Sequence, residues 1–169
     1  MTSSHYYQPT DSARESFLEV FRRYGAGVAI ITLRKPSGEP TGFTATSVAS
    51  LSLLPPRATF NMSTMASSWP AINSSESLLI HTLPSSAHSL ATQFSGEAAS
   101  RFDGIELLEG PDGLPLVPGA TGYLHAKIVE RHTVGDAAMV AVEILGGGLG
   151  LDESALVYQH QDYRVAASL

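Results

Sequence analysis

The sequence predicts a mainly β protein of the α+β kind, a closed antiparallel β-barrel with helices packed on its outside. Its strand-like segments either alternate apolar and polar residues or form short apolar runs, and short turns join most of them. Only three segments have the spacing of amphipathic helices. Strands joined mainly by hairpins, with few helices between them, are typical of antiparallel sheets and barrels.

Length and composition predict a single domain. The chain has 169 residues, of which 43% are hydrophobic, which is enough for one core and small for two. Residues 1–10 are expected to form a flexible N-terminal arm and residues 11–169 to form the domain. Ser12 and Glu15 make a capping box at the start of the first helix. Apolar residues then recur at helical spacing up to a glycine: Phe17, Phe21, Tyr24 and Gly25.

The first strands are predicted from an apolar run and a hydroxyl-rich segment. Residues 28–33 are continuously apolar apart from one threonine, which indicates a buried strand. After a proline and glycine turn, residues 43–53 alternate small or apolar residues with hydroxyl residues, the period of a strand with one polar face. Pro55 and Pro56 interrupt this ladder, and residues 57–62 predict the next strand.

The rest of the chain is predicted to contain two helices and five strands. One helix begins at Ser67 or Ser68, and the other begins at Ser85 or Ser86 and ends at Gly96. The strands are expected at residues 77–83, 122–132, 137–145, 155–158 and 162–165.

Two further segments are predicted to be irregular. Residues 101–118 are rich in proline and glycine, so we expect an excursion over the surface. The glycine cluster at residues 146–150 predicts a loop. It does not match the dinucleotide-binding fingerprint, because the spacing differs and no helical pattern follows.

Charge and cysteine content exclude several classes of function. The chain has 10 basic and 16 acidic residues, so it has no excess of positive charge for nucleic acid or an anionic membrane. It has no cysteine, which excludes disulfides and thiolate catalysis and favours a cytoplasmic protein. No apolar run approaches the roughly 18 residues of a membrane span, and we expect no signal sequence.

The sequence predicts no metal site. It lacks the G-x-S-x-G and H-E-x-x-H motifs, and its histidines have no cysteine partners or close i, i+4 pairs. His81 and His125 lie in predicted strands, where a hydrogen-bonded core or surface histidine is usual. His132 flanks a hairpin tip with Asp136, where it either faces a ligand or belongs to a solvated turn.

Residues 42–69 are the stretch most indicative of ligand binding, because hydroxyl side chains concentrate where an ordinary core has aliphatic ones. Ser67 or Ser68 is a good N-cap for a helix with Pro70 in its first turn. Hydroxyls, free backbone N–H groups and the positive end of a helix dipole would then meet at one place, which suits a phosphate. The alternative is a serine-rich turn that only caps a helix.

Seven segments resemble the flavin reductase family in order and spacing, and together they cover nearly the whole chain: FRRYGAGVAIIT, GFTATSVASLSLLPP, FNMSTMASSWPA, QFSG, RFDGI, RHTVGDA and YQHQDYR. The resemblance implies a split β-barrel that forms a homodimer and binds FMN or FAD. It also implies a set of residues that contact the flavin from its ring system to its phosphate: Thr44, Ala45, Thr46, Ser47, Ser50, Ser52, Ser63, Ser67, Ser68 and Trp69.

The resemblance implies an activity as well, the NADH- or NADPH-dependent reduction of flavin that is then delivered to a partner monooxygenase. Hydride transfer to flavin N5 needs two stacked rings and no protein acid or nucleophile, so no catalytic residue is predicted. His132 and Asp136 resemble the family's hairpin motif near the nicotinamide. Tyr163 and Arg164 resemble its closing strand beside the same cleft.

Three positions depart from the family's usual pattern. Ala137 stands where a histidine usually follows the Gly-Asp of the hairpin, which favours an alternative function, a flavin-binding split barrel without nicotinamide turnover. Leu54 stands where an aspartate is common. Residues 64–66 offer no basic side chain at the phosphate, whose charge would then rest on hydroxyls and the helix end. A pyridoxamine-phosphate-oxidase-like protein is a more distant alternative.

Overall fold

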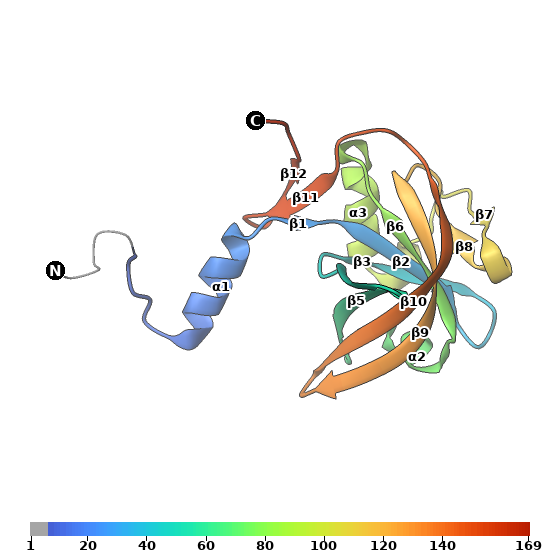
Figure 1. Cartoon of the computed structure of the whole chain (residues 1–169), viewed down its shortest axis with the longest axis horizontal. Coiled ribbons are helices and arrows are strands. Elements are labelled where there is room, and N and C mark those ends of the chain that lie inside the picture. The colour runs from blue at the N-terminus through green and yellow to red at the C-terminus, as the bar shows by residue number, and fades with distance from the viewer. Residues whose placement is uncertain (1–6) are drawn as a thin grey trace.

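The computed structural model describes residues 7–169, and its main element is a curled antiparallel sheet of seven strands (Figure 1). Most of the predicted N-terminal arm therefore lies outside the described residues. The order across the sheet is β3-β2-β6-β9-β10-β5-β4, and every neighbouring pair is antiparallel. The strands are β2 (Ala29–Arg34), β3 (Pro40–Ala45), β4 (Ala49–Leu53), β5 (Pro56–Ser63), β6 (Ser77–Thr82), β9 (Gly122–Val134) and β10 (Ala137–Leu149).

The antiparallel, mainly β fold class is confirmed, but the expectation of a closed barrel is wrong. Strands β3 and β4 are the two edges of the sheet and are not paired with each other. They are consecutive in the chain, so the open seam of the barrel lies at the turn that joins them, residues 46–48. Edge strands carry backbone groups without ladder partners, which leaves this seam available to a ligand.

Two small sheets complete the strands. One joins β1 (Ala26–Gly27) to the terminal hairpin of β11 (Leu156–Gln159) and β12 (Asp162–Val165). The other pairs β7 (Leu108–Glu109) with β8 (Pro115–Leu116). The segment that contains β7 and β8 is more than the predicted surface excursion, because Leu114 and Val117 are buried in it.

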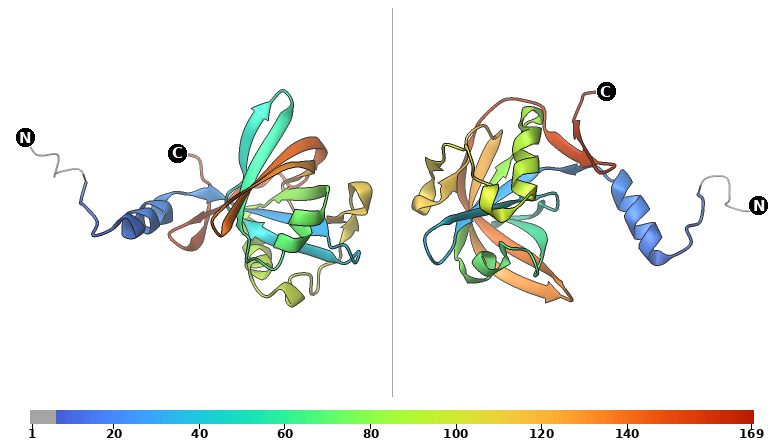
Figure 2. Two further views of the ribbon diagram at one scale, coloured as in Figure 1. Left: turned by 90° about the horizontal axis from the view of Figure 1, so that it is seen from below. Right: turned by 180° about the vertical axis from the view of Figure 1, so that it is seen from behind.

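Three α-helices are described: α1 (Ala13–Arg23), α2 (Trp69–Ser74) and α3 (His88–Ser95), with 3₁₀ turns at Ser85–Ala87, Ala98–Ser100 and Pro111–Gly113. The Ser12 hydroxyl accepts a hydrogen bond from Glu15 N at 3.1 Å, which confirms the predicted N-cap. Helix α3 packs against β3 on the barrel. Helix α1 instead projects away from the barrel and buries none of its residues (Figures 1 and 2).

The core consists of two clusters of buried residues on either side of the curled sheet. The first fills the barrel and includes Ile31, Phe60 and Val140. The second lies between the barrel, α3 and the terminal hairpin, and includes Phe94 and Leu156. The second cluster fixes the base of α3 beside the seam, because Phe94 at its C-terminal end is fully buried.

The hydroxyl-rich segment 43–53 forms two strands rather than the single strand predicted. The chain turns at residues 46–48, where the Ser47 hydroxyl donates to Asn61 O (3.0 Å) and accepts from Asn61 N (2.9 Å). The Ser47 hydroxyl thus bonds the backbone groups of Asn61 on β5 in place of a strand neighbour. The chain can then leave β3 and enter β4 at the opposite edge of the sheet. A period-two pattern alone cannot reveal such a side-chain substitution.

The glycine cluster is part of a strand, and its prediction as a loop is wrong. Strand β10 continues to Leu149 and pairs with β9 across a bulge between Ile144 and Gly146. A Cβ at Gly147 would lie 2.2 Å from the Tyr123 carbonyl oxygen. The strands therefore approach more closely here than a side chain permits, which explains glycine inside a strand.

His81 is a hydrogen-bonded core histidine, as its place in a predicted strand indicates. The residue is fully buried on β6. Its Nδ1 lies 3.1 Å from Ile30 O, and its Nε2 lies 3.1 Å from Val117 N, which donates to it. The imidazole is therefore neutral with its proton on Nδ1. Desolvation by burial lowers the pKa of His81 to about 4, and the bond to Ile30 opposes that shift.

Candidate functional site

A pocket of about 400 Å³ lies at the seam of the barrel, within the range typical of small-molecule sites. We call it the hydroxyl-lined pocket. It is formed by β3, the turn after it, β5, the start of α2, the end of α3 and the loop that follows α3. Its lining residues are Phe43, Thr44, Ala45, Thr46, Ser47, Asn61, Met62, Ser63, Ala66, Ser68, Phe94, Ser95 and Arg101.

Ser68 is the most buried of these hydroxyl residues, with 1% of its surface exposed. Its hydroxyl lies 3.3 Å from Thr41 Oγ1 and 3.4 Å from Gly42 O. Ser68 is the N-cap residue of α2, one of the two positions predicted, but its hydroxyl makes no capping hydrogen bond and bonds to the wall of the barrel instead. Ser67 is exposed and precedes the N-cap position.

Arg101 supplies the positive charge that residues 64–66 lack. Its Nη1 donates to Gly42 O (2.8 Å) and to the Ser68 hydroxyl (3.2 Å), while Nε and Nη2 donate to Gly96 O at 3.0 and 2.9 Å. A guanidinium has five N–H donors, so one N–H of Nη2 has no acceptor among residues 7–169. Burial lowers the pKa of Arg101 below its ordinary value, but an arginine keeps its charge.

The loop that carries Arg101 is held by a side chain of α3. The Gln93 carboxamide lies within hydrogen-bonding distance of three loop carbonyls, those of Ser100, Arg101 and Asp103, at 2.9–3.1 Å. These contacts fix the loop against the end of the helix. Arg101 was missed from sequence because it lies in the expected surface excursion, although the RFDGI motif was a signal at that position.

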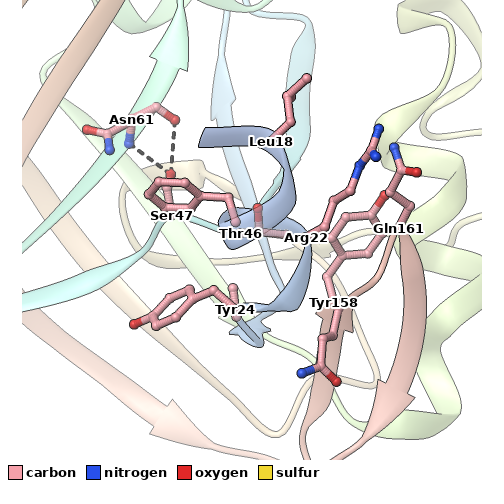
Figure 3. A pocket seen from close by; sticks show the side chains of 11 residues that line it. Leu18, Arg22, Tyr24, Thr46, Ser47, Asn61, Tyr158 and Gln161 are labelled. Carbon is pink, nitrogen blue, oxygen red and sulfur yellow. Dashed lines mark hydrogen bonds between the residues drawn. The ribbon is translucent and has the colours of Figure 1, made fainter. Parts of the chain in front are cut away.

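A second pocket of about 430 Å³ adjoins the first, and we call it the aromatic pocket (Figure 3). It is enclosed by α1, the terminal hairpin and the turn after β3. Its lining residues are Leu18, Phe21, Arg22, Tyr24, Ala26, Thr46, Ser47, Asn61, Tyr158, Gln159 and Gln161. Thr46, Ser47 and Asn61 line both pockets, so the two form one continuous cleft along the seam.

Six of the residues implied by the resemblance are brought together in the hydroxyl-lined pocket: Thr44, Ala45, Thr46, Ser47, Ser63 and Ser68. Four others line neither pocket. Ser50 and Ser52 lie on the exposed strand β4, and the Ser52 hydroxyl donates to Pro55 O at 2.6 Å. Ser67 is exposed, and Trp69 packs against the barrel core.

The four residues predicted near the nicotinamide, His132, Asp136, Tyr163 and Arg164, also lie outside the two pockets. His132 and Asp136 are exposed at the tip of the β9–β10 hairpin. The tip is tied to the seam by backbone, because Asp136 O accepts from Thr64 N at 2.8 Å. Tyr163 lies in β12, where its ring packs edge to face on Tyr158, a residue of the aromatic pocket, with centroids 5.4 Å apart.

Residues 7–169 contain no cluster of three or more histidine, aspartate or glutamate side chains able to hold a metal ion. Within the same part of the chain, no helix has the length and apolar character needed to cross a membrane.

Comparison with known proteins identifies the family. Residues 21–167 match the model of the flavin reductase like domain, and the chain belongs to this family. The chain is 39% identical over 120 residues to the NADH:FMN oxidoreductase of Rhodococcus qingshengii, a match that covers 70% of this chain and 62% of the enzyme's length. It is 27% identical over 150 residues to HsaB, a flavin-dependent monooxygenase reductase subunit of Mycobacterium tuberculosis, covering 88% of this chain and 80% of HsaB.

A solved structure has the same fold. The flavin reductase domain protein of Arthrobacter sp. FB24 superposes with a TM-score of 0.88 at 42% sequence identity, covering 92% of this chain and 97% of that one. The split antiparallel barrel described above is therefore the fold of this family.

Proposed function

We propose that this chain, as a single domain spanning residues 11–169, is an NAD(P)H-dependent flavin reductase that supplies reduced FMN or FAD to a partner monooxygenase. The observation that carries the proposal is the continuous cleft at the seam, in which a hydroxyl-lined pocket with one arginine adjoins an aromatic pocket. Two ligands placed in the two pockets would meet at Thr46, Ser47 and Asn61. The names of the Rhodococcus and Mycobacterium relatives support the same activity and partner.

The hydroxyl-lined pocket fits a flavin phosphate by its donors. Arg101 offers a free N–H at the wall. The hydroxyls of Ser63, Ser68 and Ser95 line the same pocket and would have to turn from the backbone carbonyls that they bond to donate to a phosphate. No carboxylate lines this pocket, so no like charge opposes a phosphate. Thr44, Thr46 and the edge backbone of β3 then face the ribityl chain and the ring.

When bound, flavin and nicotinamide supply the redox chemistry, a hydride transfer to flavin N5. The residues of the cleft bind and orient the two rings, and the aromatic side chains around them exclude water. No acid or base at the reacting atoms is needed, in agreement with a cleft lined by hydroxyls, amides and aromatic rings.

The test is NADH consumption by purified protein with and without added FMN. We expect consumption that depends on both protein and flavin. The second candidate function, flavin binding without nicotinamide turnover, is favoured by Ala137 at the hairpin tip. It predicts that the protein quenches the fluorescence of FMN in a titration while NADH is not consumed. It also predicts that Ala137→His creates or increases the NADH consumption.

A homodimer is part of the proposal, and helix α1 supports it. Its apolar side chains Phe17, Val20, Phe21 and Tyr24 are 58–68% exposed. Phe17 and Phe21 stack with ring centroids 4.6 Å apart, so they form one continuous apolar face. A projecting helix with such a face is typical of a subunit interface, and a second copy of the chain would cover Phe17 and Val20, which line neither pocket. We also infer a cytoplasmic location, supported by the absence of cysteine.

Light scattering on the purified protein is expected to give a dimer, twice the 17.9 kDa of one chain. The double variant Phe17→Ser/Val20→Ser removes two apolar side chains that line neither pocket. It should weaken the dimer at least about tenfold, since burying one such side chain stabilises by about 1.5–3 kcal/mol. Arg14→Ser, on the same helix, is the control and should remain dimeric. A parent protein that is monomeric and still binds flavin tightly would refute the dimer.

A further inference from the structure

The C-terminal end of α1 is held over the aromatic pocket by the terminal hairpin. His160 N donates to Arg22 O, and the Gln159 carboxamide donates to Arg23 O at 2.8 Å. The last carbonyls of a helix have no partner inside it, so these bonds attach the helix end to the hairpin. His160 and Gln161 at the hairpin turn have φ values of 54° and 60°, a left-handed conformation uncommon for residues other than glycine.

This turn places Gln161 in the aromatic pocket beside Arg22 (Figure 3). Both side chains line the pocket, one from the hairpin and one from α1. Positive φ values at both residues are those of a tight two-residue hairpin loop between the paired residues Gln159 and Asp162, which fixes the position of Gln161.

The guanidinium of Arg22 is only partly used by the protein. Its Nη1 forms an ion pair with Glu19 at 2.6 Å, and 40% of the side chain is exposed. Its Nε is buried and has no hydrogen-bond acceptor among residues 7–169. A ligand cannot reach the buried Nε, so it would meet the guanidinium at Nη2, which has no hydrogen-bond acceptor among residues 7–169.

The remaining lining of the pocket identifies the class of ligand. Among the described residues that line the pocket, Arg22 is the only ionisable side chain apart from the tyrosines, and the amides of Asn61, Gln159 and Gln161 accompany it. Aromatic rings suit stacked bases, and amides suit sugar hydroxyls and a carboxamide. A flat heterocycle joined to a phosphate matches this combination, and the adjoining pocket already has Arg101 for the phosphate of a flavin.

We propose that Arg22 determines binding of the hydride donor, by donating from its Nη2 to a phosphate of the nicotinamide dinucleotide in the aromatic pocket. This inference rests on the proposed reductase function and deepens it. It makes α1 part of the donor site, with Arg22 and Arg101 serving the anionic groups of two different ligands.

The test compares Arg22→Gln with Arg23→Gln. Both variants remove one positive charge from the same turn of α1, but the Arg23 side chain is exposed and lines neither pocket. We expect Arg22→Gln to raise the KM for NADH about tenfold, as for a lost hydrogen bond to a charged group, with kcat and the KM for FMN unchanged. Arg23→Gln should leave all three parameters as in the parent.

Calorimetric titration of NADH into each protein reads binding without turnover. The Kd of Arg22→Gln should be raised about tenfold, and added salt should weaken NADH binding less in this variant than in the parent. Repeating the titration with NADPH locates the phosphate. An equal loss for both nucleotides supports the pyrophosphate, and a larger loss for NADPH supports the 2′-phosphate.

Equal NADH affinities for the two variants would overturn the assignment. A rise in the KM for FMN but not for riboflavin, without any change for NADH, would also overturn it, because Arg22 would then serve the flavin phosphate. A parent that binds NADH but does not oxidise it would refute the reductase function, and the calorimetric comparison would still decide the role of Arg22.

Discussion

Replacing Arg101 by alanine is expected to weaken FMN binding by about 10- to 100-fold, the range for losing a hydrogen bond to a charged group at about 1.5–3 kcal/mol. The substitution removes the only cation among the described residues that line the hydroxyl-lined pocket. It also releases the carbonyls of Gly42 and Gly96, which this side chain ties together across the pocket wall. The affinity of the variant for riboflavin, which lacks the phosphate, should fall less than its affinity for FMN.

Flavin fluorescence titration measures both affinities. Arg34→Ala is a matched control, because Arg34 also donates to two backbone carbonyls, those of Gly113 and Gly38, but lines neither pocket. It should leave the preference for FMN over riboflavin intact. If Arg101→Ala remains folded and keeps that preference, the phosphate is bound elsewhere.

The second large effect concerns pH. Acidification from pH 7 to pH 4 is expected to cost the fold about 3 kcal/mol through His81 alone. Burial lowers the pKa of this histidine from 6.5 to about 4 in the folded protein. The unfolded chain therefore binds a proton more readily between these two values. The contribution of neutral His81 to the free energy of unfolding is present above pH 6.5 and is lost as the pH falls towards 4. The loss is about 1.4 kcal/mol for each unit of difference between the two pKa values.

Chemical denaturation at a series of pH values measures this loss. In His81→Leu the free energy of unfolding should be lower at pH 7, because Ile30 O and Val117 N lose their partner, but its dependence on pH should be shallower. His88→Gln, which removes an exposed histidine, should keep the slope of the parent. An unchanged slope in His81→Leu would contradict the neutral buried imidazole.

Most strands were predictable from sequence because their residue patterns are local. The apolar run at residues 28–33 and the alternation at residues 122–132 are properties of single segments, and both became strands of the sheet. The failures occurred where a distant partner determines the structure. The glycines after Leu145 remain in a strand because β9 lies unusually close, and no local pattern in β10 reveals that approach.

The candidate site was predictable only in part for the same reason. The positions of Thr44 and Ser63 in strand patterns predict a polar wall, and both residues line the hydroxyl-lined pocket. Arg101 reaches that pocket from a loop held by Gln93, a contact between side chain and backbone that residue spacing does not encode. The helix pattern around Arg22 did not predict a place in a pocket, because that pocket is completed by a hairpin more than 130 positions later in the chain.

The most direct test of the account is the anaerobic reduction of FMN by NADH with a catalytic amount of the protein. Direct hydride transfer predicts that oxidised flavin bleaches at a rate proportional to protein concentration. It also predicts a slower rate with NADH deuterated at the transferred position when chemistry limits turnover. The contradictory result is a protein that binds FMN and NADH in titrations and leaves the flavin oxidised.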